Sequence, residues 1–254
     1  MKKLNLNREY SSVDNFRSLI SGFIEELNID SHKNEQKIIE LHHIGKFLMF
    51  FENRYKIEKL NEEPDFIIFD NEKRIGLEHQ ILIDDKSKEK EGFFGNLCKL
   101  AEKELKKEKG LPNFLANIYM HPSFNGKINE KQKLVNEIFQ IVKKYILTGE
   151  LLENEVIDRI FSMKHSHISL SPNLGAWWQK EVNGELIINA IKKKEKKFYN
   201  YLNNTNLSQW LLIVIGSVGE SSYMIENDFE LNVETKFDKV YILEDNSTNL
   251  YEIK

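Results

Sequence analysis

The stretch that decides the fold is "EEPDFIIFDNEKRIGLEHQ", Glu62 to Gln80. Two apolar runs, residues 65–69 and 74–83, flank the turn-forming residues "DNEK" and have the length and composition of buried strands. Each run nevertheless carries a carboxylate: Asp65 lies at the mouth of the first and Glu78 inside the second. A carboxylate in an apolar strand is unfavourable unless it is paired or liganded. The stretch therefore predicts a hairpin with a chemical role.

A hairpin that turns symmetrically about Asn71 and Glu72 sets Asp65 opposite Glu78. Directly opposed residues have their Cβ atoms ~5 Å apart, where two bare carboxylates repel each other. A shared divalent cation relieves both charges. Mg²⁺ suits such a pair, because it prefers carboxylate oxygens and keeps several waters. The sequence thus predicts a magnesium site on this hairpin.

Strand geometry adds a third residue to the pair. Side chains alternate between the two sides of a strand. Gln80 is therefore expected on the same side as Glu78, and His79 on the other side. The pattern is an acid, a second acid, and an amide two residues further on.

Helical and strand patterns continue through the chain without a linker or an internal repeat, which predicts one domain, residues 1–254. A helix over 34–51 precedes the hairpin and places Glu40 at the border of its packed stripe. The interspersed elements indicate a mixed α/β sheet flanked by helices. The other expected helices are 12–27, 93–108, 129–147, 152–161 and 186–202. The other expected strands are 55–60, 114–121, 167–171, 210–216 and 239–244.

"PDF" followed after a turn by "IGLEHQ" resembles the core motif of the PD-(D/E)xK nuclease superfamily, which has the restriction-endonuclease-like fold. That resemblance implies an α-β-β-β-α-β core over about 34–121, with a helical and stranded extension over 122–254. It implies that Asp65 and Glu78 hold Mg²⁺ or Mn²⁺. Gln80 stands where the family usually has a catalytic lysine.

The same resemblance extends to neighbouring elements. Some restriction enzymes of the family carry the lysine on the next helix, where Lys103 is the better placed candidate and Lys99 the other. Glu40 resembles the acidic residue that many members carry on the first core helix. Many members act as dimers, so a homodimer is also implied.

Two lysine-rich segments are candidates for contact with nucleic acid. Residues 86–109 hold eight lysines against five glutamates, and "KKKEKK" at 192–197 holds five lysines against one glutamate. Lysines at such positions contact backbone phosphates with little base readout, although a solvated helix face has the same composition. The lysines predicted to contact phosphates are Lys99, Lys103, Lys106, Lys193, Lys194 and Lys197.

The predicted function is a Mg²⁺-dependent nuclease in bacterial defence or mobile-element biology, with DNA favoured as the substrate and RNA as the second choice. The alternative is a catalytically inactive nuclease-like module that binds nucleic acid or a protein. Gln80 in the usual lysine position motivates this alternative.

Structural interpretations of the same residues remain open. Asp65 after Pro64 is also typical of a strand-entry residue that caps a turn. Glu78 fits a structural ion pair with a lysine, or an exposed sheet edge. The histidines lack the spacing of a zinc site. Exposed tryptophans stack on bases, but core or subunit packing is favoured for Trp177 and Trp178.

Composition sets outer limits on these interpretations. The chain has 254 residues, a formal net charge of -4 and one cysteine, Cys98, expected in a helix core. One cysteine excludes an intrachain disulfide. No run approaches the ~20 apolar residues of a membrane span, and no apolar segment follows the N-terminal lysines. These features predict a cytoplasmic protein without a membrane partner.

Overall fold

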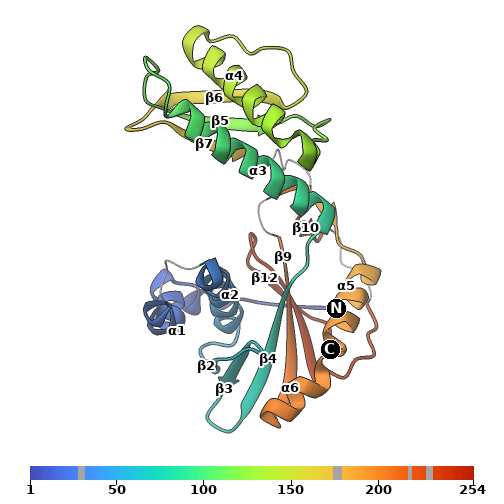
Figure 1. Ribbon diagram of the computed structural model, residues 1–254. Helices are drawn as coiled ribbons and strands as arrows, with labels where there is room; N and C mark the ends of the chain where they lie inside the picture. Colours follow the sequence, from blue (N-terminus) through green and yellow to red (C-terminus); the bar gives the residue numbers. More distant parts are fainter. Residues whose placement is uncertain (28–31, 174–178, 217–218, 227–230) are drawn as a thin grey trace. The chain divides into compact units, whose positions relative to one another are not determined.

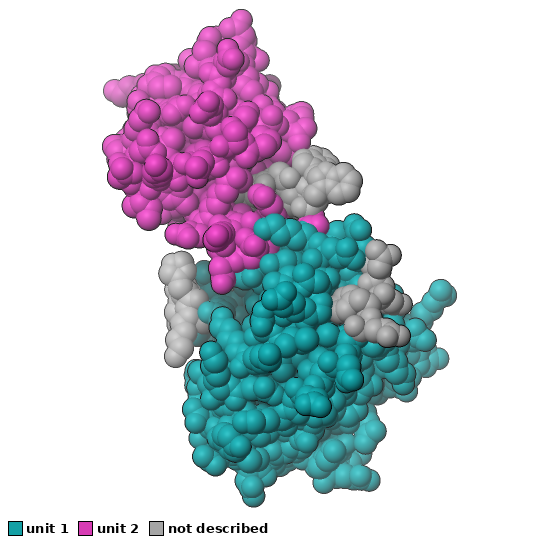
Figure 2. Space-filling model, turned by 90° about the vertical axis from the view of Figure 1, so that its right-hand side faces the viewer, with its two compact units in different colours: residues 1–83, 180–217, 222–254 teal, residues 84–179, 218–221 magenta. Residues whose placement is uncertain are grey.

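A computed structural model describes residues 1–27, 32–173, 179–216, 219–226 and 231–254. The chain divides into two compact units, coloured separately in Figure 2. Unit 1 comprises residues 1–83, 180–217 and 222–254, and unit 2 comprises residues 84–179 and 218–221. The fold is mixed α/β, as predicted. The division into two compact units does not test whether the chain is one domain, so that expectation stays a prediction.

Unit 1 is built on a seven-stranded mixed sheet (Figure 1). Its strand order is β1, β12, β11, β9, β4, β3, β2. The strands are β2 (Lys56–Leu60), β3 (Phe66–Phe69), β4 (Arg74–Ile81), β9 (Ser208–Ile215), β11 (Lys239–Glu244), β12 (Asn249–Glu252) and β1 (Lys2–Leu4). β4, β9 and β11 are parallel neighbours, and the other pairings are antiparallel.

Helices cover both faces of this sheet. The helices of unit 1 are α1 (Val13–Glu26), α2 (His32–Met49), α5 (Gly184–Glu195) and α6 (Phe198–Thr205), with a 3₁₀ turn η1 (Arg8–Tyr10). α1 and α2 pack on one face and α5 and α6 pack on the other. The central strands β4 and β9 are therefore buried on both sides. Two short strands, β8 (Lys180–Glu181) and β10 (Tyr223–Met224), pair separately.

Unit 2 holds a three-stranded sheet in the order β6, β5, β7. Its elements are α3 (Asp85–Leu105), β5 (Phe114–Met120), η2 (Ile128–Glu130), α4 (Lys131–Thr148), β6 (Ile157–Lys164) and β7 (Ser169–Asn173). α3 and α4 cover one face of this sheet and bury Cys98, as predicted, so burial raises the pKa of its thiol to about 12.

The expected core over about 34–121 does not form a single sheet. Its first three strands lie in the seven-stranded sheet, but β5 belongs to the three-stranded one. On the side away from β3, β4 pairs with β9 rather than with β5. The sequence pattern along residues 114–120 correctly predicts a strand, but the pattern does not specify which sheet that strand joins.

Two expected helices differ from the structure. The predicted helix over 152–161 is wrong, because the strand β6 begins at Ile157. The β5–β6 ladder has a register shift here: Tyr119 pairs with Arg159, but the next residue, Met120, pairs with Ile157. The extra residue of a bulge lets Ile157 and Ile160 face the core three positions apart, which imitates helical spacing. The helix over 186–202 is two helices, α5 and α6.

Candidate active site

The turn between β3 and β4 fixes the hairpin register. The side chain of Asp70 accepts hydrogen bonds from the backbone N–H groups of Glu72 and Lys73, at 3.0 and 2.9 Å. These bonds lower the pKa of Asp70. The ladder then pairs Phe66 with Leu77. One further step along the same register sets Asp65 opposite Glu78, as the sequence predicts.

Asp65 and Glu78 lie close together in a poorly solvated position. The Asp65 backbone N–H lies 3.3 Å from Glu78 Oε2, and Asp65 Oδ2 accepts a hydrogen bond from the His79 backbone N–H at 2.9 Å. Glu78 is 3% exposed, which rules out an exposed sheet edge. Burial, and then the Glu78 charge, raise the pKa of Asp65 to about 7. The two groups therefore resist being charged together.

A lysine and a tyrosine reach Glu78 from the helices before β9. Lys194 Nζ, on α5, lies 2.5 Å from Glu78 Oε1. Tyr201 Oη, on α6, donates a hydrogen bond to the same oxygen at 2.9 Å. Burial and the Glu78 charge raise the pKa of Tyr201, which keeps it a donor. Glu78 thus has a cation and a neutral donor on one oxygen, while its other oxygen faces Asp65.

α2 brings a second acid and a lysine near Asp65. Glu40 is buried, and its Oε1 accepts a hydrogen bond from Gln36 Nε2 at 3.1 Å. Lys37 Nζ lies 2.8 Å from Glu40 Oε2 and 3.8 Å from Asp65 Oδ1. The position of Glu40 at the border of the packed stripe is confirmed. Lys37 links the two acids and was not singled out from the sequence.

The side chain of Gln80 carries a buried hydrogen-bond acceptor without a donor in the described structure. Its Oε1 is buried and has no hydrogen-bond partner among the described residues. A buried carbonyl oxygen without a donor is destabilising and calls for a water or a ligand. The amide at this position offers an oxygen where a lysine would offer a charge.

The donor set fits a hydrated magnesium ion. Across the described residues there is no group of three or more histidine, cysteine, aspartate or glutamate side chains arranged to hold a metal. A closed zinc or calcium cage is therefore not formed by these side chains. Mg²⁺ needs only one or two carboxylates, because waters and substrate oxygens complete its shell. Asp65, Glu78 and the unpartnered Gln80 oxygen match that requirement.

His79 points to the opposite side from Glu78, as predicted. Its Nε2 lies 3.0 Å from His43 Nδ1 on α2, and His43 Nε2 lies 3.8 Å from Asp245 Oδ1. Burial lowers the pKa of His79 far below its ordinary value and also lowers that of His43. Lys46 bonds to Asp245 at 2.6 Å. Two neutral histidines thus sit beneath the carboxylate strand.

The lysine at Glu78 is one that the sequence assigned to phosphate contacts. Lys103, the predicted catalytic lysine, lies with Lys99 on α3 in unit 2, and Lys106 is the C-cap residue of that helix. In unit 1, Lys193 is exposed and Lys197 pairs with Glu63 at 2.8 Å. One signal identifies Lys194 in retrospect. It follows Ile187, Ala190 and Ile191 at helical spacing, on the buried stripe of α5.

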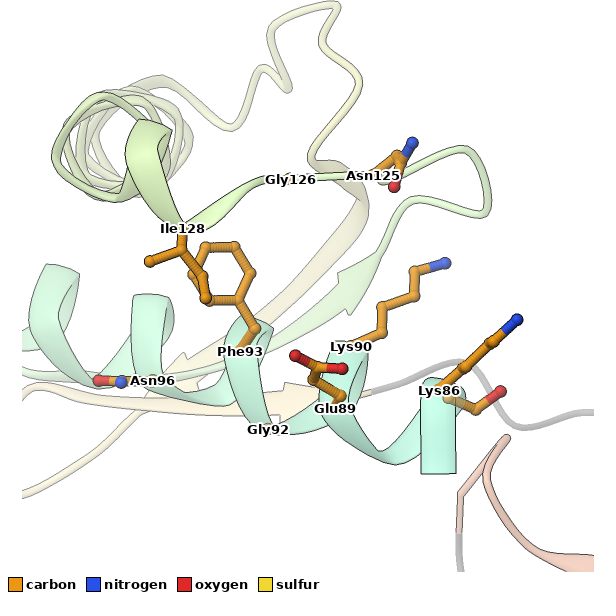
Figure 3. A pocket seen from close by; sticks show the side chains of 10 residues that line it. Lys86, Glu89, Lys90, Gly92, Phe93, Asn96, Asn125, Gly126 and Ile128 are labelled. Atoms are coloured by element: carbon orange, nitrogen blue, oxygen red, sulfur yellow. The ribbon is translucent and has the colours of Figure 1, made fainter. Parts of the chain in front are cut away.

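A hollow of about 560 Å³ belongs to unit 2. Phe93, Ile128, Lys86 and Lys90 are among its lining residues, and in the view of Figure 3 the two lysines lie to the right of Phe93 and Ile128. Trp177 and Trp178 lie outside the described residues.

None of the described helices has both the length and the apolar character required to cross a membrane. No protein-family profile, curated protein or solved structure matches the chain.

Proposed function

We propose that the protein is a Mg²⁺- or Mn²⁺-dependent nuclease whose active site comprises Asp65, Glu78, Gln80 and Lys194, with DNA as the preferred substrate over RNA. The observation that carries the proposal is the facing pair of Asp65 and Glu78, with Asp65 at a pKa raised to about 7 and with Lys194 on Glu78. A buried, mutually repelling acid pair beside a lysine is typical of catalytic sites.

The order of elements in unit 1 supports a restriction-endonuclease-like core. α2, β2, β3 and β4 are followed in unit 1 by α5, α6 and β9, and β9 is parallel to β4. This is the order helix, three strands, helix, strand, with unit 2 inserted between the third strand and the next helices. The lysine then comes from the helix before β9, a position different from the one predicted on α3.

Each residue of the site has a separate task. Asp65 and Glu78 would hold the cation, which when bound supplies positive charge to the scissile phosphate and lowers the pKa of the attacking water. The open Gln80 oxygen accepts a hydrogen bond from that water and orients it. Lys194 stays protonated at Nζ beside Glu78 and donates hydrogen bonds to the phosphate oxygens. Tyr201 fixes the Glu78 carboxylate through its hydroxyl.

A second candidate function rests on the same contact. The ion pair of Lys194 with Glu78 neutralises one carboxylate without a metal, as a structural pair would. In that case the protein is an inactive module that binds nucleic acid or a protein. Calorimetry with Mn²⁺ separates the two candidates. Saturable binding that disappears in Asp65→Ala supports the nuclease, and no binding supports the inactive module.

The direct test is cleavage of plasmid and linear DNA with Mg²⁺ or Mn²⁺. We expect wild type to nick or degrade DNA, Glu78→Ala to be inactive, and Lys194→Met to lose most activity. Lys193→Met is the matched control, because Lys193 is the exposed neighbour of Lys194 on the same helix. An inert wild type overturns the proposal. Equal cleavage by Glu78→Ala also overturns it.

A further inference from the structure

Among the described residues of unit 2, helices cover one face of the three-stranded sheet and none covers the other, which we call the open face. Ala116 and Ile118 of β5 and Leu170 of β7 are buried under α3 and α4. The alternate residues of the same strands point away from those helices. β5 pairs with both β6 and β7, so these alternate residues form three rows. The open-face rows are Leu115, Asn117 and Tyr119, then Met163, Phe161 and Arg159, then Ser169, Ser171 and Asn173.

Aromatic rings and a guanidinium group lie together on this face. The rings of Tyr119 and Phe161 meet edge to face, with centroids 5.7 Å apart. The Arg159 guanidinium lies 4.4 Å from the centroid of the Tyr119 ring. Phe161 is 55% exposed and Met163 58% exposed. The Phe161 ring is therefore exposed in the described structure, and planar groups stack favourably on nucleobases.

The remaining chemistry of the face matches a single strand of nucleic acid. Asn117 on β5 and its ladder partner Ser171 on β7 are both half-buried, and their amide and hydroxyl groups can bond base edges. Arg159 is the one charged residue of the nine and is a cation, with its neighbour Asp158 3.5 Å away. Unstacked bases can lie on such a face, whereas a duplex hides its bases within the stack. A backbone phosphate of the bound strand would pair with Arg159 in competition with Asp158.

We propose that the open face of the β6-β5-β7 sheet binds single-stranded nucleic acid by stacking bases on Phe161 and Tyr119. The inference deepens the nuclease function proposed above and rests on it for the role of the bound strand as substrate. It assigns unit 2 the recognition of unpaired nucleotides. The chemistry remains with the carboxylates of unit 1.

The test is fluorescence anisotropy of the full chain with a labelled oligothymidylate in EDTA, where cleavage does not occur. A duplex of the same length is the comparison ligand. Stacking on one ring accounts for about a fivefold to hundredfold change in affinity. Phe161→Leu keeps apolar surface but removes the ring, so we expect it to weaken single-strand binding by at least about fivefold. Phe161→Tyr keeps a ring and should bind as wild type does.

Leu147→Ala provides the matched control, because Leu147 is an equally exposed apolar residue of unit 2 on α4, at 58% exposure. It should leave affinity unchanged. Equal binding by wild type and Phe161→Leu overturns the proposal, as does a preference for duplex. A chain that binds no oligonucleotide but forms a dimer dissociated by Phe161→Leu also overturns it, since the face is then a protein interface. Cleavage lost in Glu78→Ala stands independently of these outcomes, so the two proposals fail separately.

Discussion

Replacement of Asp65 by asparagine should make the protein more stable at alkaline pH. The pKa of Asp65 rises from 3.8 to about 7 because the carboxyl is buried and faces Glu78. Between these values the folded state keeps a proton that the unfolded state has released. Folding stability therefore falls as pH rises from about 4 to about 7, and the whole penalty is present above pH 7.

The magnitude follows from the size of the shift. One pKa unit equals about 1.4 kcal/mol of free energy. Integration of the proton-binding difference from pH 5 to pH 8 gives a loss of about 3 kcal/mol in the free energy of unfolding from Asp65 alone. The side chain of Asp65 is only 18% exposed, so solvent weakens its electrostatic interaction with Glu78 only slightly. The asparagine side chain of the Asp65→Asn variant cannot ionise, and its amide oxygen can still accept the hydrogen bond from the His79 N–H.

The assay is urea unfolding of wild type and Asp65→Asn in EDTA at pH 5 and pH 8. We expect wild type to lose about 3 kcal/mol more than the variant between the two pH values. Groups that titrate in both proteins cancel in this difference. Addition of Mg²⁺ at pH 8 should then stabilise wild type and leave Asp65→Asn unchanged. Parallel pH dependence of the two proteins in EDTA would refute the reasoning.

Three further predictions concern the surroundings of the pair. Lys194→Met should lower the free energy of unfolding at pH 8 by about 2 kcal/mol, because Glu78 then stays buried without its cation, whereas a Lys193→Met variant should not; equal stability of the two would contradict this. His79 has a lowered pKa, so its contribution has the opposite sign to that of Asp65: stability is lost as pH falls through the ordinary histidine pKa of 6.5, because the unfolded state then binds a proton that the folded state does not. His79→Leu should remove that loss and His42→Leu, at the exposed neighbour of His43, should not, as chemical denaturation at pH 5.5 and 7.5 would measure. Gly76→Ala should destabilise by about 1 to 3 kcal/mol, because its Cβ would collide with the Gln209 side chain, while Gly95→Ala, with open space on α3, should stabilise by about 1 kcal/mol; thermal melts in which both variants shift in the same direction would contradict the packing argument.

The hairpin could be predicted from sequence because its determinants are local. Asp70 and the residues after it specify the turn, and the apolar alternation specifies the faces. Register then follows, since a slip by one residue would turn the apolar set toward the wrong side. For this reason the sequence alone predicts that Asp65 lies opposite Glu78 and that His79 points to the other side of the sheet.

The lysine could not be predicted in the same way. Lys194 is 116 residues from Glu78 in sequence, and it reaches the site because β9 pairs with β4. Pairing of distant parallel strands leaves no local pattern. The helix that follows β4 in the chain, α3, belongs to unit 2, and the catalytic role predicted for Lys103 on that helix stays a prediction. The strand β6 was missed for a local reason, a bulge that gives its core residues helical spacing.

The pairing of β4 with β9 has a consequence for biosynthesis. When Glu78 leaves the ribosome, its cation, its tyrosine donor and its strand neighbour Leu211 have not yet been made. Nearly all of unit 2 is synthesised before they appear. A nascent or truncated chain that ends before α5 therefore carries two acids and no partner for Glu78 on that side. Such a fragment is expected to lack the proposed activity, so the order of synthesis delays that activity until α5 and α6 have been made.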